Sequence, residues 1–444
     1  MPVLNEKSPV TFRDELPEAV DVAIIGGGIA GICTALFLAR DGVPVLVCEK
    51  GRVAGEQSSR NWGWVRQMGR DEAELPIMMD SIKLWEGLAG ETDNQVGFGR
   101  GGTMYLADNE EEQAEFEQWL PIGEQHGLDT RALSRDELRK LLAGAADKWC
   151  GGIYTASDGR AEPFQAVPTI ARVARAAGCR IIENCAVRSI DSEAGRTCAV
   201  ITELGRVRAG AVVCAAGAWS TTFLGNLGIS LPQLVVRNTV ARTGSAPEVF
   251  PGCAGSHQFA FRRRQDGGYT LALSDTLEHF PGADSFRYLF KFLPAFKQIR
   301  HALRLRPGKD LVARLFPQRR WQADEVTPFE RTRVLNPEPS PWAAGELRRR
   351  MVEHLPSLAG VDIEESWAGM IEATPDFVPV LDQVPGYPGF YLATGFSGHG
   401  FGIGPGAGRV MARLVQGKPP GYDLTRFRFS RFSDGSPIIP GPAV

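Results

Sequence analysis

A glycine-rich turn near the N-terminus has the spacing of a dinucleotide-binding site. Gly26, Gly28 and Gly31 fit the pattern G-x-G-x-x-G, and Glu49 follows Gly26 by 23 residues. The first glycine permits a tight turn, the second lets a pyrophosphate approach a helix N-terminus, and the third lets that helix pack on a strand. A carboxylate at this separation accepts hydrogen bonds from a ribose, so the pattern predicts NAD or FAD. The contacts expected from this unit are Gly26, Gly28, Ile29, Ala30, Gly31, Glu49 and Lys50.

A second glycine-rich segment lies near the C-terminus and favours FAD over NAD. Seven glycines fall between Gly395 and Gly408, after the apolar run Phe390–Thr394. Where side chains are absent, backbone N–H groups and a helix dipole can approach a flat ligand that gathers negative charge. A nicotinamide dehydrogenase does not need its last segment folded back onto the cofactor, so this segment indicates a flavin.

Elements from distant parts of the chain must position these glycines. Residues 20–25, 32–40 and 43–48 have the patterns of a strand, a helix and a strand, a complete βαβ unit. Residues 234–333 shift to hairpin-like strands. We therefore predict an α/β protein with a discontinuous, doubly wound, Rossmann-like FAD-binding domain and an α+β antiparallel-sheet substrate domain. The expected FAD-binding segments are 1–95, 155–230 and 355–444, and the substrate-binding segments are 96–154 and 231–354.

Further helices and the C-terminal tail follow from local patterns. Helices are expected at 75–88, 110–126, 164–177, about 285–296 and 341–355, and Ser134 with Glu137 forms a capping box. In the tail, phenylalanines alternate with arginines in a way that imitates a nucleic-acid-binding stripe. We expect instead a terminal strand packed on the body. The residues of this pattern are Arg426, Phe427, Arg428, Phe429, Arg431 and Phe432.

The bulk composition argues against several classes of partner. The chain has 444 residues, 43% of them hydrophobic, enough for two domains with a large core. Its net charge of −3 gives no reason to expect nucleic acid or an acidic membrane as a partner. The eight cysteines show no C-x-x-C and no zinc spacing, which favours a reduced, cytoplasmic protein without a metal site. We expect no secretory leader and no transmembrane segment.

Four motifs, in order, resemble those of a known flavoprotein group. They are the N-terminal fingerprint, Val213–Ser220, Ala373–Pro379 and Ala393–Gly402. The chain resembles the D-amino acid oxidase superfamily over nearly its whole length, in the branch with glycine oxidase, sarcosine oxidase and bacterial D-amino acid dehydrogenases. The resemblance implies an FAD-binding domain with an antiparallel substrate domain. It adds these cofactor contacts: Ser59, Arg60, Asn61, Gly63, Trp64, Val187, Ala216, Gly217, Trp219, Phe396, Gly398, His399, Gly400, Phe401 and Gly402.

Departures from this resemblance bear on the chemistry. Glycine oxidase and D-amino acid dehydrogenases carry an arginine for the substrate carboxylate just before Thr-Pro-Asp, but residues 367–373 contain none. Sarcosine oxidase has a flavin-linking cysteine where this chain has Gly369, so we expect non-covalent FAD. No lysine lies between Tyr269 and Phe280, where sarcosine oxidase has its oxygen-activating lysine. The electron acceptor is therefore left open between O2 and a carrier.

The substrate-positioning candidates are cations near these contacts. Arg66 lies in the loop where sarcosine oxidase places a substrate-binding arginine, and a structural or flavin ion pair is an equally weighted alternative. Arg262 and Arg264 share one strand face, although a solvated hairpin end is the favoured interpretation. His399 is expected near the flavin ring, with no proton-transfer role assigned. Glu372 is left without a role.

These features predict FAD-dependent oxidation of a C–N bond in an N-substituted amino acid, such as a sarcosine-, opine- or iminodiacetate-like secondary amine. Hydrolysis of the resulting imine gives an oxo acid and an amine. The alternatives are a D-amino acid dehydrogenase or oxidase and, in a different class, a non-catalytic or tRNA-modifying flavin module. A flavin monooxygenase would need an NADPH site, and no second fingerprint is present. The exact substrate and the oligomeric state are left open.

Overall fold

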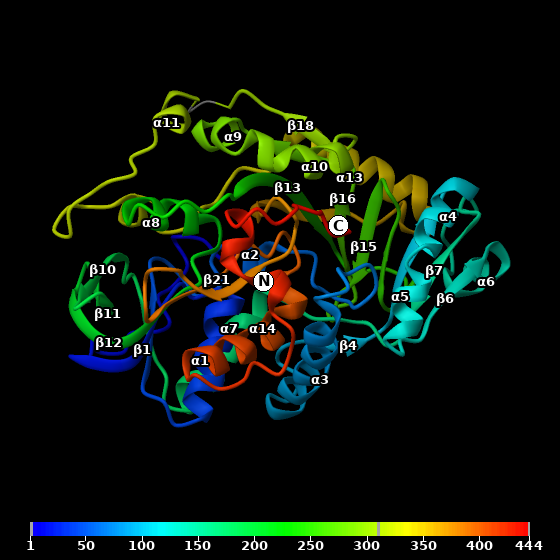
Figure 1. Ribbon diagram of the computed structural model, residues 1–444. Coiled ribbons are helices and arrows are strands. Elements are labelled where there is room, and N and C mark those ends of the chain that lie inside the picture. Colours follow the sequence, from blue (N-terminus) through cyan, green and yellow to red (C-terminus); the bar gives the residue numbers. More distant parts are fainter. Residues whose placement is uncertain (1–2, 309–310, 443–444) are drawn as a thin grey trace.

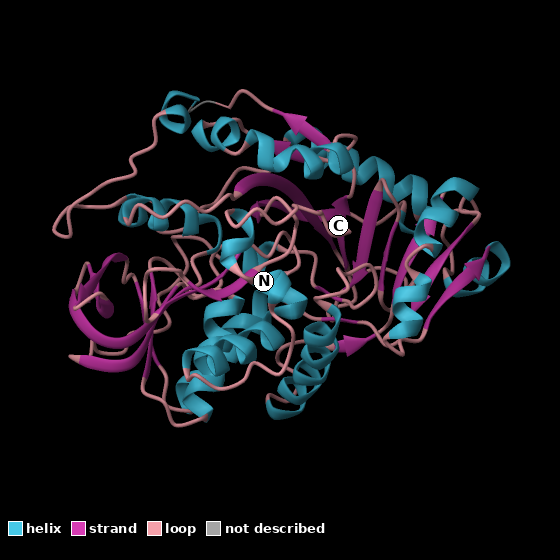
Figure 2. Cartoon of the chain, in the orientation of Figure 1, coloured by secondary structure: helices cyan, strands magenta, loops and turns pink. Residues whose placement is uncertain are grey.

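The computed structural model describes residues 3–308 and 311–442, which fold around two large sheets (Figures 1 and 2). The first sheet has eight strands, and its centre is the parallel series β21–β12–β1–β2–β9. Antiparallel strands β10, β11 and β20 extend it. The bounds are β1 (Ala19–Ile25), β2 (Val45–Glu49), β9 (Arg180–Glu183), β10 (Val187–Glu193), β11 (Arg196–Thr202), β12 (Gly205–Cys214), β20 (Val380–Gln383) and β21 (Phe390–Thr394).

The parallel strands carry apolar residues on both faces, and helices cover each face of the sheet. Residues 22–25 and 45–48 are continuous buried runs, as expected for strands buried on both faces. One face packs against α1 (Ile29–Arg40), α3 (Leu75–Glu91), α7 (Pro163–Ala176) and α14 (Gly400–Val415). The other packs against α8 (Ser220–Asn226) and α12 (Pro328–Arg331). This arrangement confirms the predicted α/β class.

The second sheet has ten strands, most of them antiparallel, with α13 (Pro341–His354) packed on it. The bounds are β5 (Thr103–Ala107), β6 (Thr130–Ser134), β7 (Gly151–Thr155), β13 (Leu234–Thr243), β14 (Cys253–Gly255), β15 (Phe259–Arg263), β16 (Tyr269–Leu273), β17 (Leu277–His279), β18 (Leu303–Leu305) and β19 (Ile363–Ala373). We expected residues from 355 onward in the FAD-binding domain, but β19 pairs along β13 in this second sheet. A small third sheet contains β3 (Trp64–Val65), β4 (Gly99–Arg100) and β8 (Gly159–Arg160).

The remaining helices are short, and two predicted helices are divided. Residues 110–126 form α4 and α5, because Pro121 in the first turn of α5 has no N–H to continue a longer helix. The helix predicted near 285–296 is divided at Tyr288 into α9 and α10. The capping box at Ser134 is confirmed. The bounds are α2 (Gln57–Arg60), α4 (Glu110–Glu117), α5 (Leu120–Gln125), α6 (Arg135–Leu141), α9 (Ala283–Arg287), α10 (Leu289–Ile299) and α11 (Leu311–Leu315).

The C-terminal tail contains two 3-10 turns, Thr425–Phe427 and Phe429–Phe432, where a strand was expected. The guanidinium of Arg431 donates to both carboxylate oxygens of Asp376 and to a backbone carbonyl, which holds this compact turn. Phe427 and Phe432 are buried in the cores on the two faces of the first sheet. The aromatic residues of the tail are therefore packing residues.

Glycines of α14 allow this helix to lie close against α1. A Cβ atom added at Gly404 would come within 2.3 Å of Ile29, and one at Gly408 within 2.5 Å of Cys33. Several glycines of the C-terminal segment thus serve helix packing, in addition to any ligand. Among the helices that the structure describes, none has both the length and the apolar character needed to cross a membrane.

Candidate active site

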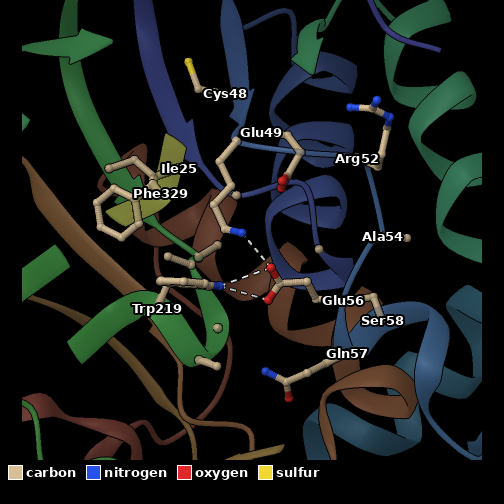
Figure 3. A pocket seen from close by; sticks show the side chains of 18 of the residues that line it. Ile25, Cys48, Glu49, Arg52, Ala54, Glu56, Gln57, Ser58, Trp219 and Phe329 are labelled. Atoms are coloured by element: carbon tan, nitrogen blue, oxygen red, sulfur yellow. Dashed lines mark hydrogen bonds and ion pairs between the residues drawn. The ribbon is translucent and has the colours of Figure 1, made fainter. Parts of the chain in front are cut away.

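A first cavity of about 100 Å³ lies at the carboxyl ends of β1 and β2, where α/β sheets commonly bind ligands (Figure 3). The fingerprint turn after β1 and the Ala-Gly turn after β12 both line it. The predicted contacts that line it are Gly26, Gly28, Glu49, Lys50, Val187, Ala216, Gly217 and Trp219.

Glu49 is held at the edge of this cavity by backbone donors. Its Oε2 accepts from the Gly27 N–H and its Oε1 from the Gly51 N–H, both at 2.7 Å. Burial raises the pKa of Glu49 to about 7. Each carboxylate oxygen retains a lone pair, so this side chain can also accept from the hydroxyls of a ribose.

Glu56 also organises the first cavity, and sequence reasoning missed it. Its carboxylate accepts from Lys50 Nζ at 2.6 Å and from Trp219 Nε1 at 3.0 Å (Figure 3). Lys50 also lies over the Trp219 ring, 4.5 Å from its centroid. Ser58 was missed as well, and its Oγ accepts from the Ile29 N–H at the start of α1. Because Glu56 and Ser58 follow no motif, only their proximity to the predicted Ser59 pointed to them.

A second cavity of about 220 Å³ shares Gly28, Gln57, Ser58, Ala215 and Gly217 with the first, so the two form one elongated site. Strands β13 and β19 of the second sheet and helices α1 and α14 of the first contribute to its wall. The predicted contacts that line it are Gly28, Ile29, Ala30, Arg60, Asn61, Gly63, Trp64, Arg66, Gly217, Phe396, Gly398, His399, Gly400 and Phe401.

Three predicted contacts line neither cavity. Gly31 packs α1 on β1, since an added Cβ would lie 2.1 Å from the Gly26 carbonyl oxygen. Ser59 is buried, with its Oγ donating to the Glu56 carbonyl. The Gly402 carbonyl accepts from Ser81 Oγ and Trp85 Nε1, which ties α14 to α3.

The elongated site fits FAD. Gly26 has φ +108, and a Cβ there would lie 2.5 Å from the Ala215 carbonyl oxygen, so the tight turn beside the site requires a glycine at this position. The first residues of α1 and α14 both line the site, which brings two positive helix ends to an anionic ligand. The Nε1 atom of Trp64 is buried there without a partner in the described structure.

Residues 21–414 match the profile of a family described as FAD dependent oxidoreductase. The chain belongs to this family. Its cofactor is FAD.

Similar proteins include amine and amino acid enzymes. Mouse (Mus musculus) mitochondrial sarcosine dehydrogenase is 24% identical, over 94% of this chain and 42% of that protein, so the chain spans less than half of this relative. Glycine oxidase of Pseudomonas aeruginosa is 24% identical, over 90% of this chain and 96% of that protein. The solved structure of L-amino acid deaminase from Proteus myxofaciens, in complex with anthranilate, is 30% identical and superposes with a TM-score of 0.92 over 97% of this chain and 98% of the other.

A buried charged cluster borders the second cavity beside the start of α14. It contains Arg66, Arg70, Glu74 and His399, each at most 3% exposed. His399 Nδ1 lies 3.2 Å from Glu74 Oε2, and Arg70 Nε donates to the Arg66 carbonyl at 3.3 Å. Each side chain also has one buried polar atom without a partner among the described residues. These atoms are Arg66 Nη2, Arg70 Nη1, Glu74 Oε1 and His399 Nε2.

Burial sets the charge of this cluster at neutral pH. It raises the pKa of Glu74 to about 8, and burial with repulsion from Arg70 and Arg66 holds the pKa of His399 well below its usual value. Burial lowers the pKa of Arg70 to about 9, so this guanidinium is still charged at neutral pH. A protonated Glu74 donates to His399 Nδ1, which leaves His399 Nε2–H as a donor. The cluster is thus positive and rich in donors, which suits an anion.

The other candidate arginines are engaged elsewhere. Arg262 is 2% exposed, and its two Nη atoms contact the Glu162 carboxylate at 2.9 and 3.2 Å. Arg264 is 8% exposed and pairs with Asp266. Neither lines the cavity, and the solvated hairpin end that we favoured is wrong because both side chains are buried. Arg60 lines the cavity, but its guanidinium donates to the Leu4, Gly55 and Ala368 carbonyls, so it also acts as a structural brace.

The side of the cavity formed by the second sheet is apolar. Its Asn238 side chain is satisfied: it accepts from Trp62 Nε1 and donates to two backbone carbonyls. No sequence motif marked this wall, because its members come from β13, β16, β17, β19 and α10. They are Val236, Val240, Leu273, Leu277, Ile299 and Ile371.

Glu372 is the only carboxylate among the residues that the structure describes in the second cavity wall. Its Oε1 accepts from the Phe396 N–H at 3.4 Å, and its Oε2 is buried without a partner in the described structure. Burial raises the pKa of Glu372 to about 7. This side chain, to which the sequence analysis assigned no role, therefore lies in the cofactor site with a pKa close to neutral pH.

Proposed function

We propose that this chain oxidises the C–N bond of an amine that carries a carboxylate, with N-substituted amino acids as preferred substrates. The observation that carries the proposal is the pair Arg66 and Arg70, each with an unpaired buried guanidinium nitrogen at the cavity wall. Leaving buried charged donors unpaired is costly, and a substrate carboxylate would satisfy both. Bound FAD supplies the two-electron acceptor.

The chain's own groups position the amine and keep it reactive. Arg66 and Arg70 would hold the carboxylate, while Leu273, Leu277 and Ile299 would cover the remainder and exclude water. Two nearby guanidinium ions and a low dielectric both disfavour an ammonium ion, so the bound amine would be neutral, as the oxidation requires. Water then hydrolyses the imine to an oxo acid and a smaller amine.

The preference for N-substituted amino acids rests on the strand opposite the flavin site. Residues 367–373 contain no arginine, and β19 presents Gly369 and Ile371 to the cavity instead. The carboxylate would therefore bind only at the Arg66 side, which leaves space for an N-substituent along β19. The similarity to sarcosine dehydrogenase supports the same substrate class.

Anaerobic stopped-flow reduction of the flavin tests the proposal. Sarcosine and iminodiacetate should reduce it faster than D-alanine, because all three place one carboxylate at Arg66 and Arg70 but only the first two have an N-substituent that can occupy the space along β19. A preference for D-alanine would refute the N-substituted class. If no carboxylated amine reduced the flavin, the whole proposal would fail.

A second candidate is the deamination of primary amino acids with apolar side chains. The apolar wall of the cavity favours it, because a large hydrocarbon group would bury well against Leu273 and Leu277. The similar L-amino acid deaminase was solved with anthranilate, an aromatic amine with a carboxylate. Adding L- and D-phenylalanine to the same panel separates the candidates: faster reduction by L-phenylalanine than by sarcosine would favour this second function.

A further inference from the structure

Large exposed apolar side chains are concentrated in one stretch of the chain. Of the thirteen such residues in the part that the structure describes, nine lie between residues 286 and 316. Those in α10 recur every three or four residues and so share one helix face. Exposed apolar side chains gathered in this way are typical of an interaction surface. The nine are Phe286, Leu289, Phe290, Leu293, Phe296, Leu305, Leu311, Val312 and Phe316.

The same stretch is strongly basic, although the whole chain has a net charge of −3. Residues 286–316 contain eight lysines or arginines and one acidic residue. Among the basic residues, Lys297 and Arg300 are exposed at the end of α10, next to the apolar face. Residues 286–316 therefore combine exposed apolar and positive groups, although the net charge of the whole chain is low.

The fold holds this stretch at the outside of the molecule. Helices α9, α10 and α11 and strand β18 lie together along one side, at the top of Figure 1, away from α1 and α14. In α10 only Ala295 is buried, and Ile299 at its last turn walls the second cavity. The inner side of the helix thus packs on the protein, while Leu289, Phe290, Leu293 and Phe296 are exposed.

We propose that this surface, called here the apolar–basic surface (residues 286–316 as far as described), docks on a lipid bilayer with anionic headgroups. An amphipathic helix with Phe and Leu on one face and Lys or Arg beside it lies in the membrane interface, and its basic groups contact the phosphates. The binding would be peripheral. A second copy of the chain is the less suitable occupant, because self-association would bring two basic surfaces together.

Vesicle flotation of the full chain with FAD bound tests this proposal, which is independent of the proposed function. The protein should float with vesicles containing about one third phosphatidylglycerol and much less with pure phosphatidylcholine. Phe290→Asp should lower the partition coefficient at least about tenfold, because Phe290 is 82% exposed in the apolar face. Lys297→Glu should weaken binding to the anionic vesicles alone, and added salt should mimic it.

The matched control is Leu204→Asp, which changes another exposed apolar residue, 55% exposed, outside the surface. Flavin absorbance verifies that each variant is folded. Equal flotation of Phe290→Asp and Leu204→Asp would overturn the proposal, as would a parent protein that binds neither vesicle. If the parent were a dimer that Phe290→Asp converts to a monomer, without vesicle binding, the occupant would be a second copy and the membrane proposal would be wrong.

Discussion

The two arginines at the cavity wall have different partners and therefore different freedom. Arg66 donates through Nη1 to the Met68 carbonyl and lies 5.4 Å from the centroid of the Tyr105 ring, so its orientation is fixed before any ligand arrives. Within the described part of the chain, the Arg70 guanidinium makes one hydrogen bond, to the Arg66 carbonyl. A carboxylate bound between them would therefore meet the Arg66 guanidinium in a fixed orientation, whereas the Arg70 guanidinium could adjust to it.

Arg66→Lys tests the assignment of the carboxylate site. Lysine keeps the charge but cannot reproduce a planar two-point contact, so kcat/KM for a carboxylated amine should fall at least about tenfold while flavin affinity is unchanged. Arg264→Lys is the matched control, since that buried arginine lies outside the cavity wall. It should cost stability and leave kcat/KM as it was. Loss of FAD from Arg66→Lys, with normal kinetics after reloading, would assign Arg66 to the cofactor.

Glu372 should make stability depend on pH. Its folded pKa of about 7 lies above the ordinary value of 4.5, so the folded state holds the proton more tightly than the unfolded state. Stability from this group is present below pH 4.5 and is lost as pH rises towards 7, at up to about 1.4 kcal/mol per pH unit. In Glu372→Gln this loss should be absent.

Urea unfolding at pH 5 and pH 8 measures the effect of Glu372. The difference between the two free energies of unfolding should be smaller in Glu372→Gln than in the parent. Exposed Glu248→Gln serves as the control and should leave the difference unchanged. An unchanged difference in Glu372→Gln would show that this carboxyl is ionised in the folded protein across the whole range.

Local spacing was sufficient to predict some site residues but not others. Gly26, Gly28 and Glu49 belong to one βαβ unit, and their separation along the chain fixes their separation in space. The charged cluster joins Glu74 to His399, which are 325 residues apart, and no periodicity marks such a pair. Arg262 was misjudged for the same reason, because its partner Glu162 lies 100 residues away.

At the scale of elements, α14 shows how one sequence signal can have two physical causes. Its glycine repeat was interpreted as ligand approach, and the first residues of the helix do line the cofactor site. Gly404 and Gly408, however, contact Ile29 and Cys33 of α1. The sequence could not separate these uses, because both require a missing side chain. Strand β19 likewise lies in a segment predicted for the FAD-binding domain but pairs with β13 of the second sheet, because strand pairing over this separation leaves no local pattern.

Gly408→Ala should destabilise the protein even though alanine is the better helix former. The added Cβ would lie 2.5 Å from Cys33 Cβ and 2.6 Å from its carbonyl carbon, and such overpacking costs typically about 1 to 3 kcal/mol. Gly345→Ala in α13 is the control, because no atom lies within 4 Å of its added Cβ. That variant should gain up to about 1 kcal/mol from helix propensity. Equal urea midpoints for the two variants would refute close packing of α14 on α1.

At the scale of the whole molecule, the cofactor site joins the two large sheets. Its wall takes residues from α1 and α14 of the first sheet and from β13 and β19 of the second. The long pairing of β13 with β19 also returns the chain from the second sheet to the first, because β20 and β21 follow directly. A ligand in this site therefore contacts both halves of the fold, and its binding free energy should stabilise both.

Removal and return of FAD tests this connection. Acid precipitation should leave intact FAD in the supernatant, since Gly369 offers no side chain for a covalent link at that position. Apoprotein prepared under milder conditions should melt at a lower temperature, and FAD at about 100 times its Kd should restore about 2.7 kcal/mol of stability. Because both sheets contribute to the wall, the holoprotein should unfold in one calorimetric transition that shifts as a whole with FAD concentration. Two transitions, only one of which responds to FAD, would mean that the second sheet folds independently of the cofactor.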